Sequence, residues 1–299
     1  MDRLESMAIL VAAVEAGSLS AAARRLRTPL ATVSRKVSEL EAHLGTRLLI
    51  RANRRLTLTE AGQSYVAACR RILEEVDEAE RTAAGEYSAP RGDLTIAAPI
   101  VFGRLHVLSI VIAFLRTYPD IDIRLALADR TVNLIEEHVD LAVRIGVLPD
   151  SSLVAARIGA VRRVVCASPA YLAARGTPAT PADLAAHDCI AFEGLSATTW
   201  GFRTGKAELA VPIRARLSVT TAEASIDAAV AGLGLTRVLS YQVTEALRDG
   251  ALTTVLAAFE PEPWPAHLLH PGGRLLPLKL RAFLDFAAPR LKSVLAGGA

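Results

Sequence analysis

The chain has 299 residues, of which 52% are hydrophobic and 22% charged, with a net charge of +3. This length suits two or three domains with a large core, and the composition excludes an intrinsically disordered chain. The N-terminus, with Asp2, Arg3 and Glu5, does not resemble a signal peptide, and the longest apolar stretch (105–115) is about half a membrane span. We therefore expect a cytoplasmic protein that has no contact with a membrane.

A first short amphipathic helix is predicted from residue 18 onward. The Ser18 hydroxyl can cap this helix. Its apolar side chains recur at helical spacing and predict a packing stripe of Leu19, Ala22, Ala23 and Leu26.

A second helix is expected from Thr28 to about residue 44. Thr28 followed by Pro29 is a start signal, because a proline at the first helical position loses no hydrogen bond. Gly45 is well placed to end the helix in a left-handed conformation. The stripe expected to face the core consists of Val33, Val37, Leu40 and Leu44.

The exposed flanks of the second helix carry small polar and basic side chains. An α-helix fits the major groove of DNA, and residues near its N-terminal end reach base edges, whereas phosphate contacts position the protein. The residues best placed for bases are Thr28, Leu30, Ala31, Thr32 and Arg35. Those better placed for phosphates are Ser34, Lys36 and Ser38, with Ser18 and Ser20 of the first helix as further DNA-contact candidates.

Residues 46–59 predict two short strands joined by a basic turn. The apolar positions of these strands are Leu48, Ile50, Leu56 and Leu58, and the turn contains Arg51, Asn53, Arg54 and Arg55. Such a wing can place Arg51, Arg54 and Arg55 against the DNA backbone or in a minor groove. Residues 1–62 have a net charge of +4 (10 Lys and Arg, 6 Asp and Glu), so the basic surplus lies entirely here. An ordinary solvated basic face is the alternative, but the order of cap, proline, helix stop and basic hairpin favours a DNA reader.

This segment resembles the LysR-type transcriptional regulators, through SLSAAARRL, VSRKVSELEAHLGTRLL and RRLTLTEAG. The length and layout of the rest of the chain are also similar to that family. Its recognition helix usually begins with Ser-Gln-Pro, whereas here Pro29, Leu30 and Ala31 stand at the matching place. Leu30 thus replaces a glutamine that often reads a base, and an apolar contact to a thymine methyl is a possible replacement.

A long helix is predicted from residue 59 to about 87, capped by Thr59 with Glu60 in its first turn. Its apolar residues repeat with a period of 3.5, which is typical of a coiled coil. We expect this linker helix to join two chains, with packing on its own domain as the alternative. The seam consists of Tyr65, Cys69, Ile72, Val76, Ala79 and Ala83. The resemblance also implies a homotetramer, formed through the effector domains.

The stretch 88–92 predicts a hinge, after which apolar strands alternate with helices. This rhythm indicates parallel sheets covered on both faces. The chain crosses to a second α/β set near residue 161 and returns near 266, which resembles the two-lobed periplasmic-binding-protein fold. The expected organisation is a winged helix-turn-helix at 1–58, a linker helix at 59–87, a hinge at 88–92 and an effector domain at 93–299. Its lobes are expected at about 93–160 plus 266–299, and at about 161–265.

Ligands of such α/β lobes bind at the carboxyl ends of strands and near helix N-termini. The resemblance places a small-molecule effector, often a small acid or aromatic compound, in the cleft between the lobes. The candidate effector-binding residues are Ala98, Pro99, Ile100, Val101, Phe102, Arg144, Trp200, Phe202, Thr221 and Glu223. The first strand ends in apolar residues and a proline, which favours a hydrophobic or larger effector. Arg144 can hold an acid, or it can pair with Asp129 or Asp140.

The sequence gives little support to an enzyme, since it contains no Gly-x-Ser-x-Gly motif and no P-loop. We expect no catalytic residues, metal site or cofactor. The widely spaced Cys69, Cys166 and Cys189 favour reduced packing cysteines, with a redox switch as the alternative. The leading hypothesis is a ligand-responsive regulator that binds double-stranded DNA, and contacts RNA polymerase if it is an activator. A solute-binding protein and a small-molecule enzyme are the competing hypotheses.

Overall fold

The computed structural model describes residues 2–52, 55–83, 89–196, 198–272 and 276–297. The chain divides into two compact units, Met1–Ala89 and Pro90–Ala299. Each unit has its own hydrophobic core. In the predicted hinge, the described residues 89–91 have no regular structure, and the first strand of the second unit begins at Gly92.

The first unit is a winged helix-turn-helix followed by a long helix. The side chains of Leu10, Val37 and Cys69, from three different helices, are fully buried in one core. The elements are α1 (Arg3–Glu15), α2 (Leu19–Arg25), α3 (Leu30–Leu44), β1 (Leu49–Ala52), β2 (Arg55–Leu58) and α4 (Glu60–Ala83).

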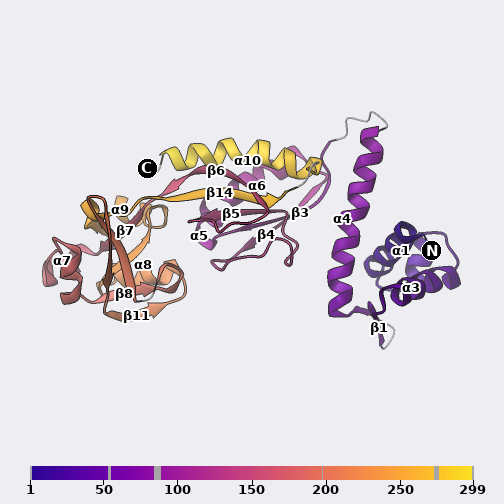
Figure 1. Cartoon of the computed structure of the whole chain (residues 1–299), viewed down its shortest axis with the longest axis horizontal. Coiled ribbons are helices and arrows are strands. Elements are labelled where there is room, and N and C mark those ends of the chain that lie inside the picture. Colours follow the sequence, from indigo (N-terminus) through magenta and orange to yellow (C-terminus); the bar gives the residue numbers. More distant parts are fainter. Residues whose placement is uncertain (1, 53–54, 84–88, 197, 273–275, 298–299) are drawn as a thin grey trace. The chain divides into compact units, whose positions relative to one another are not determined.

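The second unit contains two five-stranded sheets, one in each lobe (Figure 1). The first sheet has the order β4-β3-β5-β14-β6. Its strands are β3 (Gly92–Ala98), β4 (Ile121–Leu127), β5 (Leu141–Ile145), β6 (Leu153–Val161) and β14 (Trp264–Pro271). The helical segments of this lobe are α5 (Ile100–Phe102), a π-helical turn (Gly103–Val107), α6 (Leu108–Thr117) and α10 (Leu278–Gly297).

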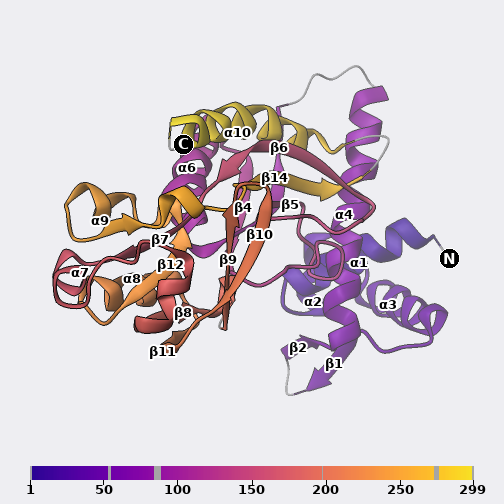
Figure 2. The same cartoon turned by 60° about the vertical axis from the view of Figure 1, so that its left-hand side comes forward.

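The second sheet has the order β11-β8-β12-β7-β13, and a separate hairpin is formed by β9 and β10 (Figure 2). The strands are β7 (Arg163–Ala167), β8 (Cys189–Phe192), β9 (Thr199–Thr204), β10 (Ala207–Pro212), β11 (Ala215–Val219), β12 (Leu235–Leu239) and β13 (Thr253–Val255). The helices are α7 (Pro169–Arg175), α8 (Ala222–Val230) and α9 (Thr244–Arg248). Short 3-10 turns lie at Pro181–Ala186, Glu193–Leu195, Ser240–Gln242 and Ala257–Phe259.

Both sheets are mixed, so the prediction of parallel sheets is wrong for part of each. Only β4, β3 and β5 in the first sheet, and β11, β8 and β12 in the second, run parallel to one another. The strands next to the two crossings, β14, β6, β7 and β13, pair antiparallel. The chain crosses between β6 and β7 and returns before β14, close to the predicted crossings.

Each sheet is covered on both faces. In the first lobe, α6 and α10 lie against the same face of the sheet (Figure 1), where Phe114 and Phe283 are in edge-to-face contact. In the second lobe, α8 packs on one face of the sheet, and the β9–β10 hairpin supplies Trp200 and Phe202 to the core on the other. The other face of the first sheet is covered by the segment that contains Leu134 and Val139, which pack against Ala142. Each lobe therefore has two buried layers.

Residues 134–138 form turns and not a further helix of the first lobe. The Asn133 side chain accepts hydrogen bonds from the backbone N–H groups of Ile135 and Glu136, which competes with a helix. His138 then adopts a positive φ of 53°. One helical stretch among the described residues, Ile100–Thr117, is apolar and long enough to cross a membrane, and α1 and α2 pass the same test only if taken as one bent span. The stretch supplies Phe102, Ile110 and Phe114 to the core of the first lobe.

Candidate nucleic-acid interface and effector site

The start of α3 differs from the prediction by one residue. The Thr28 hydroxyl donates to the Leu26 carbonyl (3.1 Å) and does not cap the helix, and Pro29 occupies the N-cap position without a side-chain hydrogen bond. The preceding helix α2 is capped as predicted, because the Ser18 hydroxyl accepts from the Ala21 N–H (3.1 Å). The turn between the two helices is therefore held by Thr28, and the start of α2 by Ser18.

The inner face of α3 follows the predicted stripe except at its end. Val33, Val37 and Leu40 are fully buried, and Gly45 ends the helix in the left-handed region (φ 65°). The prediction for Leu44 is wrong, because this side chain is exposed. The last turn of the helix thus extends past the core of the unit.

The outer face of α3 carries most of the candidate DNA contacts. Leu30, Ala31, Arg35 and Ser38 are exposed, as is Ser20 of α2, while Ser18, Thr28, Thr32 and Ser34 are partly exposed. The Arg35 guanidinium lies 2.5 Å from the Glu39 carboxylate, one turn along the same helix. Such an exposed pair is weak, about 0.3–0.5 kcal/mol, so Arg35 remains available for a base or phosphate.

Lys36 is directed into the domain. Its ammonium lies 2.5 Å from the Glu5 carboxylate of α1, and its side chain is only 14% exposed. This ion pair joins α1 to α3 and leaves little of the ammonium for DNA. The geometry therefore argues against the predicted phosphate contact of Lys36.

The wing is an antiparallel hairpin in which Ala52 pairs with Arg55. Arg54 lies outside the described residues, and for Arg51 and Arg55 only the strand positions are described. The alternation predicted for the first strand is wrong, since Leu48 and Leu49 are buried and Ile50 is exposed.

Leu48 and Leu49 both donate their backbone N–H groups to the Glu41 carboxylate of α3. Glu41 was not predicted to have a role, because one glutamate in a helix gives no sequence signal for such a contact.

The long helix α4 begins as predicted, because the Thr59 hydroxyl accepts from the Gly62 N–H (2.9 Å). Its predicted seam divides into two parts. Cys69 is fully buried and Tyr65 partly buried in the core of the same unit, whereas Ile72 is 40% exposed. Val76 is partly exposed and Ala79 exposed. Ile72, Val76 and Ala79 thus present an apolar stripe that the first unit does not fully cover.

The predicted effector residues after β3 divide between the lobe core and the contact between lobes. Ala98 and Phe102 are buried in the core of the first lobe, and Pro99 occupies the N-cap position of α5. The Ile100 N–H donates to the Asp129 carboxylate (3.0 Å). Val101 is 3% exposed and packs against Phe192 and Ala222 of the second lobe. Val101 therefore faces the opposite lobe.

An aromatic cluster lies beside this contact. The ring of Tyr241, from the second lobe, meets the rings of Phe102 (5.3 Å) and His106 (5.8 Å) in edge-to-face geometry. The Tyr241 hydroxyl and the His106 Nε2 atom are buried without a hydrogen bond of normal geometry. The sequence assigned no role to His106 or Tyr241, because neither belongs to a recognisable motif.

Two acidic side chains influence the pKa of the Tyr241 hydroxyl. The pKa of this hydroxyl is raised by burial first, and then by the charges of Asp129 and Glu223, with Gln242 opposing the shift. Burial also raises the pKa of Asp129, an effect that the hydrogen bond from Ile100 opposes and the Glu223 charge increases. One oxygen of Glu223, Oε2, is buried without a partner. These charge effects place Glu223 and Tyr241 of the second lobe near Asp129 of the first.

The remaining candidates lie in three different surroundings. The Arg144 guanidinium donates to the Thr131 hydroxyl (2.9 Å), while the two proposed carboxylate partners accept backbone N–H groups elsewhere. Thr221 caps α8 by accepting from the Ala224 N–H (3.3 Å). Trp200 and Phe202 are buried in the core of the second lobe, under the hairpin. The predicted aromatic wall is therefore part of that core, because alternate residues of β9 point toward the sheet.

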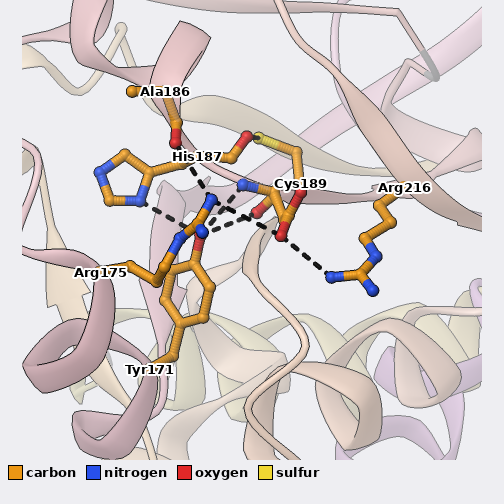
Figure 3. A network of polar contacts seen from close by, with 7 residues as sticks. Tyr171, Arg175, Ala186, His187, Cys189 and Arg216 are labelled. Atoms are coloured by element: carbon orange, nitrogen blue, oxygen red, sulfur yellow. Dashed lines mark hydrogen bonds and ion pairs between the residues drawn. The ribbon is translucent and has the colours of Figure 1, made fainter.

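A polar network at the surface of the second lobe connects α7, β8 and β11 (Figure 3). The Tyr171 hydroxyl accepts from the Asp188 N–H (3.0 Å) and lies 3.2 Å from His187 Nδ1. The Asp188 carboxylate accepts from Arg216 (3.1 Å), with Arg175 at 3.8 Å. Each of these contacts joins neighbouring elements of this lobe, so the network has a structural role.

Comparison with known families decides the identity of both units. Residues 4–63 match the family described as bacterial regulatory helix-turn-helix protein, lysR family, and residues 88–292 match the LysR substrate binding domain. The chain belongs to the LysR family of transcriptional regulators. The two matched regions correspond to the first and second compact units.

Similar LysR-type regulators match along nearly the whole chain. An HTH-type transcriptional repressor of Pseudomonas aeruginosa is 34% identical over 289 residues, covering 96% of this chain and 91% of the relative. The regulator CrgA of Neisseria meningitidis is 35% identical over 298 residues, covering 98% of both. The activator AaeR of Escherichia coli is 30% identical over 298 residues, covering 95% of this chain and 93% of that protein. Since these relatives include a repressor and an activator, their similarity assigns no direction of regulation.

Solved structures of LysR-type regulators have the same two-unit architecture. CrgA from Neisseria meningitidis aligns with a TM-score of 0.62 and 32% identity, covering 96% of this chain and 98% of that chain. The full-length virulence activator AphB of Vibrio cholerae aligns with a TM-score of 0.61 and 29% identity, covering 95% and 98%. The chain is thus a LysR-type regulator with a DNA-binding unit and an effector-binding domain.

Proposed function

We propose that this LysR-type regulator binds double-stranded DNA through α3 and the wing, and that a small-molecule effector bound between its two α/β lobes changes its DNA binding or activity. The exposed Leu30, Ala31 and Arg35 near the start of α3 support the first part. They lie where a recognition helix presents side chains to base edges.

The contact between the lobes is the observation that carries the effector proposal. There, Val101 meets Phe192 and Ala222, next to buried and unpartnered polar atoms of Tyr241 and Glu223. A buried polar group without a partner costs free energy, which a ligand that bonds to it returns. A molecule that contacts both lobes also favours one arrangement of them over another, and the population shifts by its differential affinity.

The surroundings of Val101 favour an effector with a substantial apolar part. Ala98, Pro99 and Ile100 offer no hydroxyl after β3, and Pro99 has no N–H to donate. The nearby hydrogen-bonding groups come instead from Tyr241 and Glu223 of the opposite lobe.

The assembly follows from the stripe on α4. We propose that Ile72, Val76 and Ala79 join two chains into a dimer, which holds two DNA readers at a fixed spacing. A tetramer through the effector domains, a cytoplasmic location, and contact with RNA polymerase if the protein activates belong to the same proposal. The regulator function is favoured over an enzyme or a solute-binding protein, because the relatives that match over the whole chain are transcriptional regulators.

A gel-shift assay tests DNA binding, using DNA upstream of the gene's own start at two salt concentrations. Specific binding that weakens as salt increases is expected, because phosphate contacts release counterions. A thermal-shift screen of small acids, aromatic compounds and lipophilic metabolites then tests for an effector. If the protein does not bind the upstream DNA specifically at either salt concentration, the regulator proposal is contradicted at this promoter. If the compounds that raise the melting temperature leave the gel shift and a promoter reporter unchanged, the effector proposal is contradicted.

A further inference from the structure

Two arginines, one buried and one partly buried, lie next to each other on one face of the second sheet. In the antiparallel pair of β12 and β7, Arg237 is opposite Val165 and Leu239 is opposite Arg163. Opposite residues point to the same face, and so do residues two apart in one strand. Arg163 and Arg237 are therefore diagonal neighbours, a relationship in which the two positions lie within about 7–8 Å of each other. Their face is the one covered by the β9–β10 hairpin.

Arg237 is only 5% exposed and has no acidic partner among the described residues. Its terminal nitrogens donate to two backbone carbonyls, those of Leu195 (2.9 Å) and Gly201 (3.3 Å). Its Nε atom is buried without a partner. Burial, and then the charge of Arg163, lowers the pKa of the guanidinium to about 10.

Arg163 lies at the edge of this face and also has a side-chain nitrogen without a hydrogen-bond partner. Its guanidinium lies over the ring of Trp264 (4.5 Å) and donates to the Glu262 carbonyl (2.8 Å), while its Nε atom is buried and unpartnered. Burial lowers the pKa of the Arg163 guanidinium, and the charge of Glu208 opposes that shift. Glu208 and Arg163 do not form an ion pair in the described part of the chain. Because Arg163 is only partly buried, this end of the arginine pair is accessible from solvent.

Two acids of the segment before β14 are engaged by other arginines. The Glu260 carboxylate accepts from Arg162 (3.0 Å), and the Glu262 carboxylate pairs with Arg203. Two guanidinium charges thus lie close together, one of them buried, without an ion pair to a carboxylate among the described residues, which is unfavourable unless an anion joins them. Guanidinium groups with free N–H donors recognise carboxylates, sulfates and phosphates through paired N–H···O bonds.

We propose that Arg163 and Arg237 form an oxyanion-binding site in the second lobe. The ligand is a compact oxyanion or the acidic group of a larger molecule, whose oxygens accept from the two Nε–H groups and from the terminal nitrogens that remain free. This site is distinct from the contact around Val101, and it does not require that the bound anion be the effector.

The two tryptophans of the chain give a specific readout for this site. Trp200 lies 5.8 Å from the Arg237 guanidinium and Trp264 lies 4.5 Å from that of Arg163, and the chain contains no other tryptophan. Purified full-length protein is titrated with sodium sulfate, phosphate or acetate at constant ionic strength, with chloride as the reference anion. Tryptophan emission and the melting temperature are followed, without DNA or effector.

The native protein should give a saturable change in tryptophan emission and a rise in melting temperature with at least one oxyanion. Arg237→Met and Arg163→Met should each lose this response at least tenfold in affinity. Arg162→Met is the matched control, because Arg162 is adjacent to Arg163 and pairs with Glu260 instead. A response to sulfate and phosphate alone assigns the site to a free inorganic anion, and a response to acetate assigns it to a carboxylate group.

A merely structural role gives a different result. If Arg237 only supports the backbone of Leu195 and Gly201, Arg237→Met melts lower than the native protein by the same amount with and without the anion. Such an equal shift in melting temperature overturns the proposal. The proposal is also overturned if the Arg237→Met and native proteins respond equally, or if none of the three oxyanions gives a saturable response. Since no DNA is present, none of these outcomes bears on the regulator function itself.

Discussion

The carboxylate of Glu41, near the end of α3, accepts hydrogen bonds from the backbone N–H groups of both Leu48 (2.8 Å) and Leu49 (3.0 Å). These two N–H groups belong to the segment that enters the wing. One side chain of the recognition helix thus fixes the start of the hairpin relative to that helix. The positions of α3 and the wing relative to each other are therefore coupled through Glu41.

Replacing Glu41 by alanine should weaken both the fold of the first unit and DNA binding. Two partly buried N–H groups lose a charged acceptor, which costs about 1–3 kcal/mol in the free energy of unfolding. Urea denaturation and a gel shift measure the two effects. Glu39→Ala is the control for stability, because Glu39 pairs with the exposed Arg35 and its loss should cost under about 0.5 kcal/mol. Equal stability of the two variants would show that the contact with Leu48 and Leu49 is unimportant.

Arg35 and Lys36 are adjacent in sequence but should respond oppositely to alanine substitution. Arg35→Ala should weaken binding to the native site by about 1–3 kcal/mol if it contacts a base edge, with little change in stability. Lys36→Ala should instead lower stability by about 1 kcal/mol, because it removes the partly buried pair with Glu5. Gel shifts on native and scrambled DNA, with thermal melts, separate the two effects. If the Lys36→Ala protein has native stability but binds both DNA sequences more weakly, Lys36 contacts a phosphate after all.

Charge placed on the outer part of α4 should separate the proposed dimer. Ile72→Asp introduces an unpaired carboxylate into the stripe formed with Val76 and Ala79, which an apolar interface does not tolerate. Sedimentation should show a folded species of half the native mass. Asp77→Asn, at an exposed position of the same helix, is the control. Native mass for an Ile72→Asp, Val76→Asp double variant would show that this stripe does not join two chains.

The sequence predicted the local structure well where the role of a residue depends on its near neighbours in the chain. The Ser18 and Thr59 caps, the Gly45 helix end and the buried Val33, Val37 and Leu40 stripe follow from helix geometry alone. Antiparallel strands at the two crossings were missed, because an apolar strand has the same pattern in either direction.

Long-range contacts were the part of the site that the sequence did not predict. Lys36 is basic and on a flank of α3, but whether it meets DNA or Glu5 depends on how α1 packs. Trp200 is aromatic in either environment, and only the β9–β10 hairpin determines that it lies in the core. Arg163 and Arg237 are 74 residues apart and come together only through strand pairing.

The three cysteine thiols should be unreactive in the folded protein at neutral pH. Burial raises the pKa of Cys69 to about 11, and that of Cys166 and Cys189 to about 12, from an ordinary value of 9.0. The folded chain therefore keeps protons that the unfolded chain loses above pH about 9. The resulting stability is fully present below that pH and is lost as the pH rises through about 11 to 12.

Thiol labelling and urea denaturation test this prediction. A thiol-specific disulfide reagent at pH 8 should label no cysteine until the chain unfolds, and the free energy of unfolding should decrease between pH 9 and pH 11. Cys69→Ala, Cys166→Ala and Cys189→Ala together should remove the thiol contribution to that decrease. Rapid labelling of any thiol in the folded protein would support the redox switch instead.

Val101 and Trp200 should affect the effector response in different ways. Val101 packs between the lobes, so Val101→Glu places a carboxylate against Phe192 and Ala222 and next to the acidic Glu223 and Asp129. The response should be lost while the first unit, which has its own core, keeps its DNA affinity without effector. Trp200→Ala should act through stability, because removing a fully buried tryptophan from a lobe core costs about 3–5 kcal/mol.

A promoter reporter with and without the effector, combined with thermal melts of the purified proteins, distinguishes these two results. The matched control for Val101 is Val230, an exposed valine at the end of α8. Val230→Glu should keep native stability and a native dose response, because its side chain faces solvent. If Val101→Glu responds with the native dose dependence, the effector binds outside the lobe contact. If Trp200→Ala melts like the native protein but responds weakly, Trp200 contacts the effector, as the sequence first suggested.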